Sequence, residues 1–383
     1  MIRNTADFDA LLETLNDFVR TRLVPHEEEV DRTGQISEGL LNEMRALGLG
    51  GLTIPERYGG AGLTVEEKIR AAFVLGWTTP AFYRRFGTND GPAFAINVAG
   101  TDEQKKRWLP RLASGEATGS FALTEPNAGS DALSLKTVAM REGESFILNG
   151  EKRFITNAPH ADVFLVMART DKEDRSAKGV SAFLVDGAAP GLIRGRADKK
   201  MGLHGNDTAD LRFENCRVPA SALVGDPGDG FKLAMRRLDV VRMEAAAIAV
   251  GNAERLIDEC VGWASDRQQF GEPIGSFQLV QAMLADSRAE AYAARCMVVD
   301  AAQRCDRGEI TIEEAAACKL FATEMVGRVA DRAVQIHGGM GYMQGTPVER
   351  FYRDVRIYRI YDGTNQIQQL VIARNMLKRH SSG

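Results

Sequence analysis

The first third of the chain carries apolar residues with helical spacing. One stripe repeats every three or four positions and consists of Leu11, Leu12, Leu15, Phe18, Val19 and Leu23. Such spacing predicts a helix, and Pro25 is expected to end it because proline lacks a backbone N–H. Further on, Thr64 is expected to cap another helix, and Thr101 with Gln104 forms a capping-box signature. These signals predict a helical domain over residues 1–117.

The period changes after Gly119, where short runs rich in β-branched and aromatic residues appear. They are SFALTE, SFILN, EKRFIT, DVFLVMART, GVSAFLVD and LRFENCRV, and Gly, Asn and Asp separate them. These runs predict strands. Asn149-Gly150, between FIL and EKRFI, predicts a tight hairpin because both turn positions favour positive φ. We expect an antiparallel β-barrel or sandwich over residues 118–226.

Long helical periods return after Phe231 and occupy the rest of the chain. One stripe consists of Phe231, Ala234, Leu238, Val241, Ala245 and Ile248. Two more stripes run over 277–301 and 312–336, and a fourth helix begins near Ile367. Long amphipathic helices with short connections predict an antiparallel four-helix bundle over residues 227–383. The predicted fold class is therefore α+β, with a helical domain, a central β domain and a C-terminal bundle.

Charge and composition limit the partners of this 383-residue chain. Lys and Arg number 48 against 52 Asp and Glu, a net charge of −4, so no basic excess exists to neutralise nucleic acid. No stretch approaches the ~20 apolar residues that span a bilayer, and no export signal is visible. The five cysteines form no CxxC pair, which favours a reducing compartment. No two histidines share metal-ligand spacing. We expect a cytoplasmic protein without a metal.

Three segments combine glycine, hydroxyl and amide residues in unusual density. FALTEPNAGSD (121–131) ends a strand in a turn whose hydroxyls and free N–H groups could hold a polar ring edge or a phosphate. QIHGGMGYMQG (335–345) follows a long helix, and IYDGTNQIQQLVIARNM (360–376) places Asp362 in a turn before another. Taken singly, these segments are also explained as an Asx-type turn, a helix C-cap and a helix-terminal acid.

Together with GEKRFITNA and RQQFGEPIGSFQ, these segments resemble the acyl-CoA dehydrogenase flavoprotein family. The five motifs occur in family order and cover essentially the whole chain. The resemblance implies FAD between the β domain and the bundle, an acyl-CoA substrate, and electron-transfer flavoprotein as electron acceptor. It also implies a homotetramer built by bundle packing.

The resemblance further assigns residues to the cofactor and the substrate. Residues near the flavin would be Phe121, Leu123, Thr124, Gly129, Ser130, Phe154, Ile155 and Thr156. Residues for the rest of FAD would be Arg267, Phe270, Gln278, Gln335, Gly338, Gly339, Thr364 and Gln366, with 335–339 coming from a neighbouring subunit. Acyl-CoA would contact Ser130, Asp239, Arg242 and Gly363.

By the same resemblance, Asp362 is the base that removes the α-proton while the β-hydrogen leaves as hydride to flavin N5. Most of the family has Glu in this motif, and Asp is shorter by about one C–C bond, ~1.5 Å. A misplacement near 1 Å can lower a rate by ~10²-fold. Some relatives place the base just before the arginine of an LDxxR-like stretch, where this chain has Val241. Glu244, about one turn further and ~60° round the helix, ranks second.

The substrate and the exact reaction stay open at this point. Asp at the base position also occurs in relatives acting on cyclohexanecarboxyl-CoA, which favours a cyclic or branched acyl group. A nitroalkane-oxidase-like flavoprotein is an alternative, although Gln369 stands where its arginine is expected. A flavin- or acyl-CoA-binding protein with little turnover is another. Arg84, Arg85 and Asp90 either approach the pocket end, where positive charge suits a carboxylated acyl group, or lie on the surface.

Overall fold

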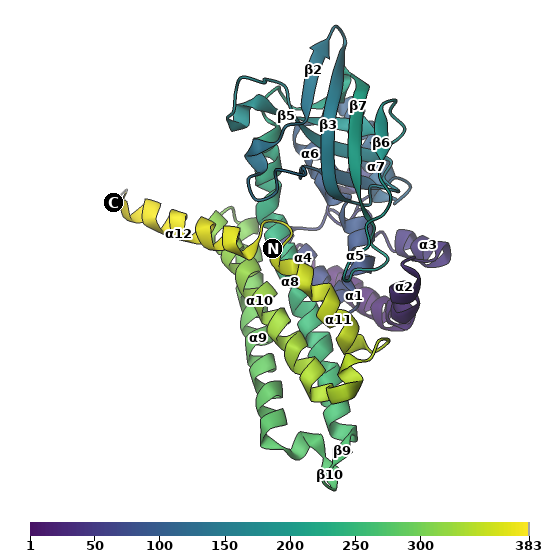
Figure 1. The fold of residues 1–383 in the computed structure, drawn as a ribbon, viewed down its shortest axis with the longest axis vertical. Coiled ribbons are helices and arrows are strands. Elements are labelled where there is room, and N and C mark those ends of the chain that lie inside the picture. The colour runs from purple at the N-terminus through teal and green to yellow at the C-terminus, as the bar shows by residue number, and fades with distance from the viewer. Residues whose placement is uncertain (382–383) are drawn as a thin grey trace.

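The computed structural model describes residues 1–381, and its elements follow the predicted order of helices, sheet and long helices (Figure 1). The first part contains seven α-helices: α1 (Thr5–Phe18), α2 (Glu27–Thr33), α3 (Glu38–Ala46), α4 (Val65–Leu75), α5 (Pro80–Gly87), α6 (Asp90–Ala99) and α7 (Asp102–Ala113). The predicted caps are confirmed, because Thr64 with Glu67 and Thr101 with Gln104 both form capping boxes. These caps satisfy backbone N–H groups that the first helical turn leaves free.

The prediction that Pro25 ends the first helix is wrong. The chain stays helical from Thr5 to Thr33, passing through a π-helical turn (Val19–Leu23) and a 3-10 turn (Val24–His26) before α2. Pro25 occupies an early position of the 3-10 turn. Its missing N–H is not needed there, so proline is tolerated.

The middle domain is built on one mostly antiparallel sheet. Its strands are β1 (Gly119–Ala122), β2 (Val138–Glu142), β3 (Ser145–Thr156), β4 (Val163–Arg169), β5 (Val180–Asp186), β6 (Leu192–Arg194), β7 (Thr208–Pro219) and β8 (Leu223–Val224). The order is β6-β7-β3-β2-β4-β5-β8, with β1 parallel to β4. Because β6 and β8 end this order without pairing with each other, the sheet is not a closed barrel.

The hairpin predicted at Asn149-Gly150 is also wrong. Strand β3 runs straight through both residues, and the turn to β2 lies at residues 143–144. The pairing of β3 with β7 shifts its register between Leu148 and Gly150, so the glycine marks a bulge. A Cβ on Gly150 would lie 2.5 Å from Thr137 Oγ1, which explains why glycine is required.

The C-terminal part is a helical bundle, as predicted. It contains α8 (Gly230–Asp266), α9 (Gln278–Asp306), α10 (Ile312–His337), α11 (Pro347–Val355) and α12 (Asn365–Ser381). A small hairpin, β9 (Gln268–Gln269) and β10 (Glu272–Pro273), joins α8 to α9 at the tip of the bundle. The start of α12 packs on α10, while its outer half extends away from the body (Figure 1).

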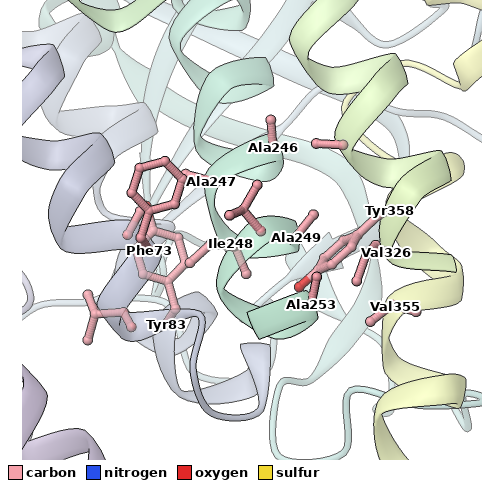
Figure 2. Packing of buried hydrophobic residues seen from close by; sticks show 14 of the residues in the cluster. Phe73, Tyr83, Ala246, Ala247, Ile248, Ala249, Ala253, Val326, Val355 and Tyr358 are labelled. Atoms are coloured by element: carbon pink, nitrogen blue, oxygen red, sulfur yellow. The ribbon is translucent and has the colours of Figure 1, made fainter. Parts of the chain in front are cut away.

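Helix α8 is the centre of the molecule because it packs on α4, α9 and α10 at once. Its middle is a run of buried small residues, Ala245–Ala247, Ala249, Gly251 and Ala253. Figure 2 shows this run between Phe73 and Tyr83 on one side and Tyr358 on the other. Small side chains allow neighbouring helices to approach closely, so α5 and the chain after α11 both reach α8.

Helices of the described residues 1–381 were searched for candidate membrane spans, and none is long and apolar enough to cross a bilayer.

Candidate active site

Asp362 lies in a short turn between a 3-10 turn (Arg356–Arg359) and α12. Its φ is +54° and that of Gly363 is +86°. Positive φ is uncommon outside glycine, although Asp tolerates it better than most residues. Thr364 caps the following helix, since its hydroxyl accepts the N–H of Ile367 at 3.3 Å. The acid therefore stands on a constrained backbone at the entry to a helix.

Lys319 of α10 binds this turn through hydrogen bonds. Its side chain is fully buried, and its ammonium group donates to the Gly363 carbonyl at 2.9 Å and to Asn365 Oδ1 at 2.8 Å. Burial lowers the pKa of Lys319 to about 8, while nearby Asp362 opposes that shift. Gln368 Nε2 also donates to the Gly363 carbonyl at 2.9 Å. These bonds fix the Gly363 carbonyl and the Asn365 side chain, which stand on either side of Thr364.

Asp362 borders a small cavity between α5, α8 and the 361–362 turn. The cavity holds about 20 Å³, room for roughly one water molecule. Its lining is Pro80, Tyr83, Arg84, Val241, Glu244, Ala245, Ile248, Tyr361 and Asp362. The side chain of Asp362 is 23% exposed, so the acid faces neither bulk water nor a closed core. The cavity therefore brings together the predicted base and residues from two distant helices.

Arg84 is the direct partner of Asp362. Its Nη2 lies 3.1 Å from Asp362 Oδ2, and its guanidinium stacks 4.1 Å from the centre of the Tyr361 ring. Burial disfavours the charge of Arg84, but Tyr361 and Asp362 more than offset this and raise its pKa. Of the residues left open by the sequence, Arg84 thus borders the cavity. Arg85 instead donates to Thr118 Oγ1 at 3.3 Å.

Glu244, the second candidate for the base, is a buried counter-ion. Its Oε1 accepts from Lys68 Nζ at 2.6 Å and from Arg237 Nη2 at 2.7 Å. The Tyr83 hydroxyl approaches the other oxygen at 3.4 Å. Asp90 completes the cluster through a short contact with Lys68. Both carboxylate oxygens of Glu244 are thus engaged by groups of this buried cluster, so its geometry is that of a structural counter-ion.

Asp239 and Arg242, expected to contact acyl-CoA, form an ion pair on α8 at 2.8 Å. They flank Val241, which lines the cavity. The Nε of Arg242 is buried, and no hydrogen-bond partner for it exists within residues 1–381. A buried donor without a partner carries a free-energy penalty that a bound polar group would remove. This observation fits a ligand beside the cavity.

The residues expected near the flavin form one accessible group at the end of β1 and on β3. Phe121, Leu123 and Thr124 are partly exposed, Gly129 and Ser130 are exposed, and Phe154 is 58% exposed at φ +57°. The Arg153 N–H donates to the Thr124 carbonyl at 2.8 Å, so the two segments lie side by side.

Ile155 is an exception within this group. Its side chain is only 3% exposed and belongs to the core of the β domain, since successive residues of a strand point to opposite faces. Its side chain therefore cannot wall a flavin, and only its backbone could do so. Thr156, the next residue, is partly exposed.

The residues expected at the rest of FAD divide between two places. Arg267, Phe270, Gln278, Gln335, Gly338 and Gly339 are exposed at the bundle tip, where Phe270 is 95% exposed. Thr364 and Gln366 lie instead at the start of α12, beside Asp362. Helix α8 has 37 residues, ~55 Å at 1.5 Å per residue, and separates the tip from the β domain (Figure 1). The residues expected to bind FAD at the bundle tip and those expected at the β domain therefore lie far apart within one chain.

Comparison with known proteins identifies the chain. Family models match all three parts: the acyl-CoA dehydrogenase N-terminal domain over residues 5–116, the middle domain over 120–216 and the C-terminal domain over 228–377. The chain belongs to the acyl-CoA dehydrogenase family. Members of this family are FAD-binding flavoproteins and oxidoreductases, and they are typically tetramers.

Individual relatives extend over nearly the whole chain. "Probable acyl-CoA dehydrogenase YngJ" of Bacillus subtilis is 42% identical and covers 98% of this chain and 99% of its own. "Acryloyl-CoA reductase (NADH)" of Anaerotignum propionicum is 41% identical over 98% and 95%. The structure of butyryl-CoA dehydrogenase from Megasphaera elsdenii has a TM-score of 0.93 and 36% identity, covering 98% and 100%.

The accessible residues of this acyl-CoA dehydrogenase family member fit FAD. At the β domain, the segment with exposed Phe154 lies beside the segment with partly exposed Leu123 and Thr124, and aromatic, apolar and hydroxyl side chains together suit a flat ring with a polar edge. At the bundle tip, exposed Arg267 suits a phosphate. Within one chain, these two places lie at opposite ends of α8.

Sequence reasoning missed one residue of the site, Lys319, and one pairing, that of Arg84 with Asp362. Lys319 had a signal, since it stands four residues after Ala315 and three before Ala322, on the apolar stripe of its helix. A lysine on such a stripe needs buried partners. The pairing of Arg84 with Asp362 had no signal in the sequence, because 278 positions separate the two residues.

Proposed function

We propose that this protein catalyses the FAD-dependent α,β-dehydrogenation of an acyl-CoA thioester, with Asp362 as the base. The supporting observation is that Asp362 stands on a constrained turn and borders a cavity between α5 and α8. The other carboxylate of the cavity, Glu244, is neutralised by Lys68 and Arg237. Asp362 is therefore the carboxylate in the cavity that is suited to accept a proton.

The chain would position the substrate and move one proton. The Asp362 carboxylate takes the proton from the carbon next to the thioester carbonyl. FAD, when bound, accepts the β-hydrogen as hydride. The turn held by Lys319 fixes the acid in place, which matters because misplacement lowers the rate steeply. Microscopic reversibility lets the same acid return the proton when the reaction runs as a reduction, the direction named for one relative.

Asp239, Arg242, Ser130 and Gly363 would contact the acyl-CoA. The unpartnered Nε of Arg242 supports this assignment. For the acyl group we propose a cyclic or α-branched chain such as that of cyclohexanecarboxyl-CoA, since it would bring its α-hydrogen closer to a short acid. The α8 wall of the cavity, with Val241, Ala245 and Ile248, is apolar, which suits a hydrocarbon, but the cavity of about 20 Å³ would have to widen to admit an acyl group.

The proposal includes assembly and partners. A homotetramer would bring the bundle tip of one copy to the β domain of another, which the separation of the two FAD groups within one chain requires. Exposed apolar residues of α12, Leu370, Met376 and Leu377, offer further surface for packing. Electron-transfer flavoprotein is the proposed acceptor. A cytoplasmic location is favoured by the five cysteines, all unpaired.

The test is an Asp362→Asn variant, purified with its flavin. We expect an unchanged flavin spectrum and FAD content, but a loss of ~10²–10⁴-fold in the rate at which acyl-CoA bleaches the flavin without oxygen. Asp331→Asn, an exposed acid on α10, is the matched control and should keep the full rate. Bleaching by Asp362→Asn at the wild-type rate would show that another group is the base.

The substrate panel contains straight, branched, cyclic and carboxylated acyl-CoAs, together with nitroalkanes. Rapid oxygen consumption with nitroalkanes would instead support the nitroalkane-oxidase-like alternative. Tight binding of acyl-CoA without bleaching by any member of the panel would support a binding protein with little turnover. Either result would replace the proposed function.

A further inference from the structure

We infer that Lys152 is a positioning residue for the flavin, because its buried ammonium group holds the Leu123 carbonyl inside the β domain and thereby turns the Thr124 N–H toward the face where the flavin is expected. The inference rests on the proposed function and deepens it by adding a residue that shapes the cofactor site. Lys152 lies on β3 just before one segment expected at the flavin, residues 154–156. Its side chain reaches the other, residues 121–124, at the Leu123 carbonyl.

Lys152 is a cation inside the core of the sheet, where charge is costly. Its side chain is fully buried, and it stands opposite Leu211 of β7. Its Nζ donates to the Leu123 carbonyl at 3.0 Å and to Glu125 Oε1 at 2.8 Å. Burial lowers the pKa of Lys152 to about 8, and Glu125 opposes that shift. An apolar side chain would fill this position without a desolvation cost, so the two bonds that the ammonium group makes are what distinguishes lysine here.

Glu125 holds the ammonium group from the turn after β1. Its Oε1 also accepts the Thr137 N–H at 2.9 Å, and its Oε2 accepts the Lys136 N–H at 2.5 Å. The backbone N–H and carbonyl of Glu125 both pair with Ala128 at 3.1 Å. Side chain and backbone of Glu125 are thus both fixed. The ammonium group that binds Glu125 is therefore fixed as well, and so is the Leu123 carbonyl.

The peptide unit between Leu123 and Thr124 is the one that Lys152 holds. This unit is trans, so its C=O and its N–H point in opposite directions. With the carbonyl bound to the buried ammonium group, the Thr124 N–H points away from it. Within residues 1–381, this N–H has no acceptor, whereas the Thr124 carbonyl accepts the Arg153 N–H at 2.8 Å. A free backbone N–H at a partly exposed residue is a donor for a ligand.

The chain after Lys152 turns outward to form the second segment. The register of β3 against β7 shifts between Lys152 and Ile155, and Phe154 within this interval has φ +57° and is 58% exposed. A bulge of this kind redirects side chains. Lys152 thus stands at the start of the bulge that exposes one flavin segment, while its side chain binds the other. One buried residue links the two segments.

A donor held in this way would act on the electronic properties of the flavin. Reduction adds electrons to the ring, so a hydrogen-bond donor at its polar edge stabilises the reduced form more than the oxidised form. Such a donor is most effective when it is in place before the reaction. The Thr124 N–H meets this condition because Lys152 binds the carbonyl of the same planar unit.

The experiment compares Lys152→Met with the double variant Lys152→Met/Glu125→Gln, both loaded with FAD and free of substrate. Met is similar in length and has no charge. Removal of one partner leaves the other buried and unpaired, whereas replacement of both relieves this penalty. We therefore expect Lys152→Met to unfold at lower urea concentration and the double variant to regain most of the loss.

The flavin should behave differently from stability. In both variants we expect altered visible circular dichroism of the bound flavin, ~10-fold weaker FAD binding and a ~10-fold smaller preference for reduced over oxidised flavin. The last change corresponds to a midpoint potential lower by about 30 mV for a two-electron couple.

Val218→Ala is the matched control for lost stability. Val218 is buried in the same sheet, seven residues or ~20 Å along β7 from Leu211. This variant should unfold more easily but keep the circular dichroism, FAD affinity and midpoint potential of the wild type. A merely structural role of Lys152 predicts that the double variant regains these three properties together with its stability, and that result would overturn the inference.

These measurements need no substrate, so they are independent of the proposed reaction. If no acyl-CoA bleaches the wild type, the proposed dehydrogenation is overturned, whatever the flavin of the Lys152 variants shows. Wild-type circular dichroism, FAD affinity and midpoint potential in Lys152→Met itself would overturn the role of Lys152 while acyl-CoA oxidation stands.

Discussion

Replacement of Lys319 by Met tests how the base-bearing turn is supported. Lys319 is fully buried and places a cation under the carbonyl of Gly363 and the side chain of Asn365. Met has similar length and no charge, so Lys319→Met removes the buried ammonium group while filling much of its volume. We expect a change in how stability depends on pH, in addition to a slower reaction from a looser turn.

The sign follows from the pKa of Lys319, which burial lowers from 10.5 to about 8. Between these pH values the folded protein binds fewer protons than the unfolded chain, so the free energy of unfolding rises as pH rises. At about 1.4 kcal/mol per pKa unit, the full gain is roughly 3 kcal/mol. About 2 kcal/mol of it falls between pH 7 and 9.5, and Lys319→Met should lack this gain.

The assay is urea unfolding of wild type and variant at pH 7 and 9.5, at one protein concentration with FAD in excess, because ligand and assembly both shift stability. Buried Lys152 and the buried cysteines titrate alike in both proteins, so the difference between them isolates Lys319. Lys106→Met, on the exposed side of α7, is the control and should follow the wild type. Equal pH dependence in wild type and Lys319→Met would refute the reasoning.

Two further substitutions test the packing of α8. Gly251→Ala would place a Cβ against backbone atoms of Phe73 in α4 and of Gly76 just after it, and should lower the free energy of unfolding by about 1–3 kcal/mol. Gly262→Ala, with open space around it, should not, and equal urea midpoints for the two variants would contradict this. Tyr358→Phe removes a buried hydroxyl that donates to Asn252 Oδ1 at 2.7 Å and should lower it by about 1–3 kcal/mol. Tyr352→Phe, 49% exposed, should change it by less than 0.5 kcal/mol, and a similar loss in both would argue against a role for the bond.

Predictions that depend on neighbouring residues succeeded, and those that depend on residues far away in the sequence failed. The caps at Thr64 and Thr101 were predicted because their partners lie three residues away. Asn149-Gly150 has the local signature of a hairpin turn, but β7 pairs with the same residues and makes them a bulge. Pro25 likewise lies in a position where the missing N–H does no harm. Tertiary pairing overrides a local preference when it satisfies more backbone groups.

The sequence by itself determined the helix–sheet–helix order, the family motifs, and an acid in a glycine-containing turn before the last helix. Only the tertiary structure decided the chemistry around that acid. Packing of α5 on α8 sets Arg84 beside Asp362, and a buried cluster turns Glu244 into a counter-ion. Such pairings depend on which charged groups distant helices bring together out of water, and the spacing of residues in the sequence does not predict this.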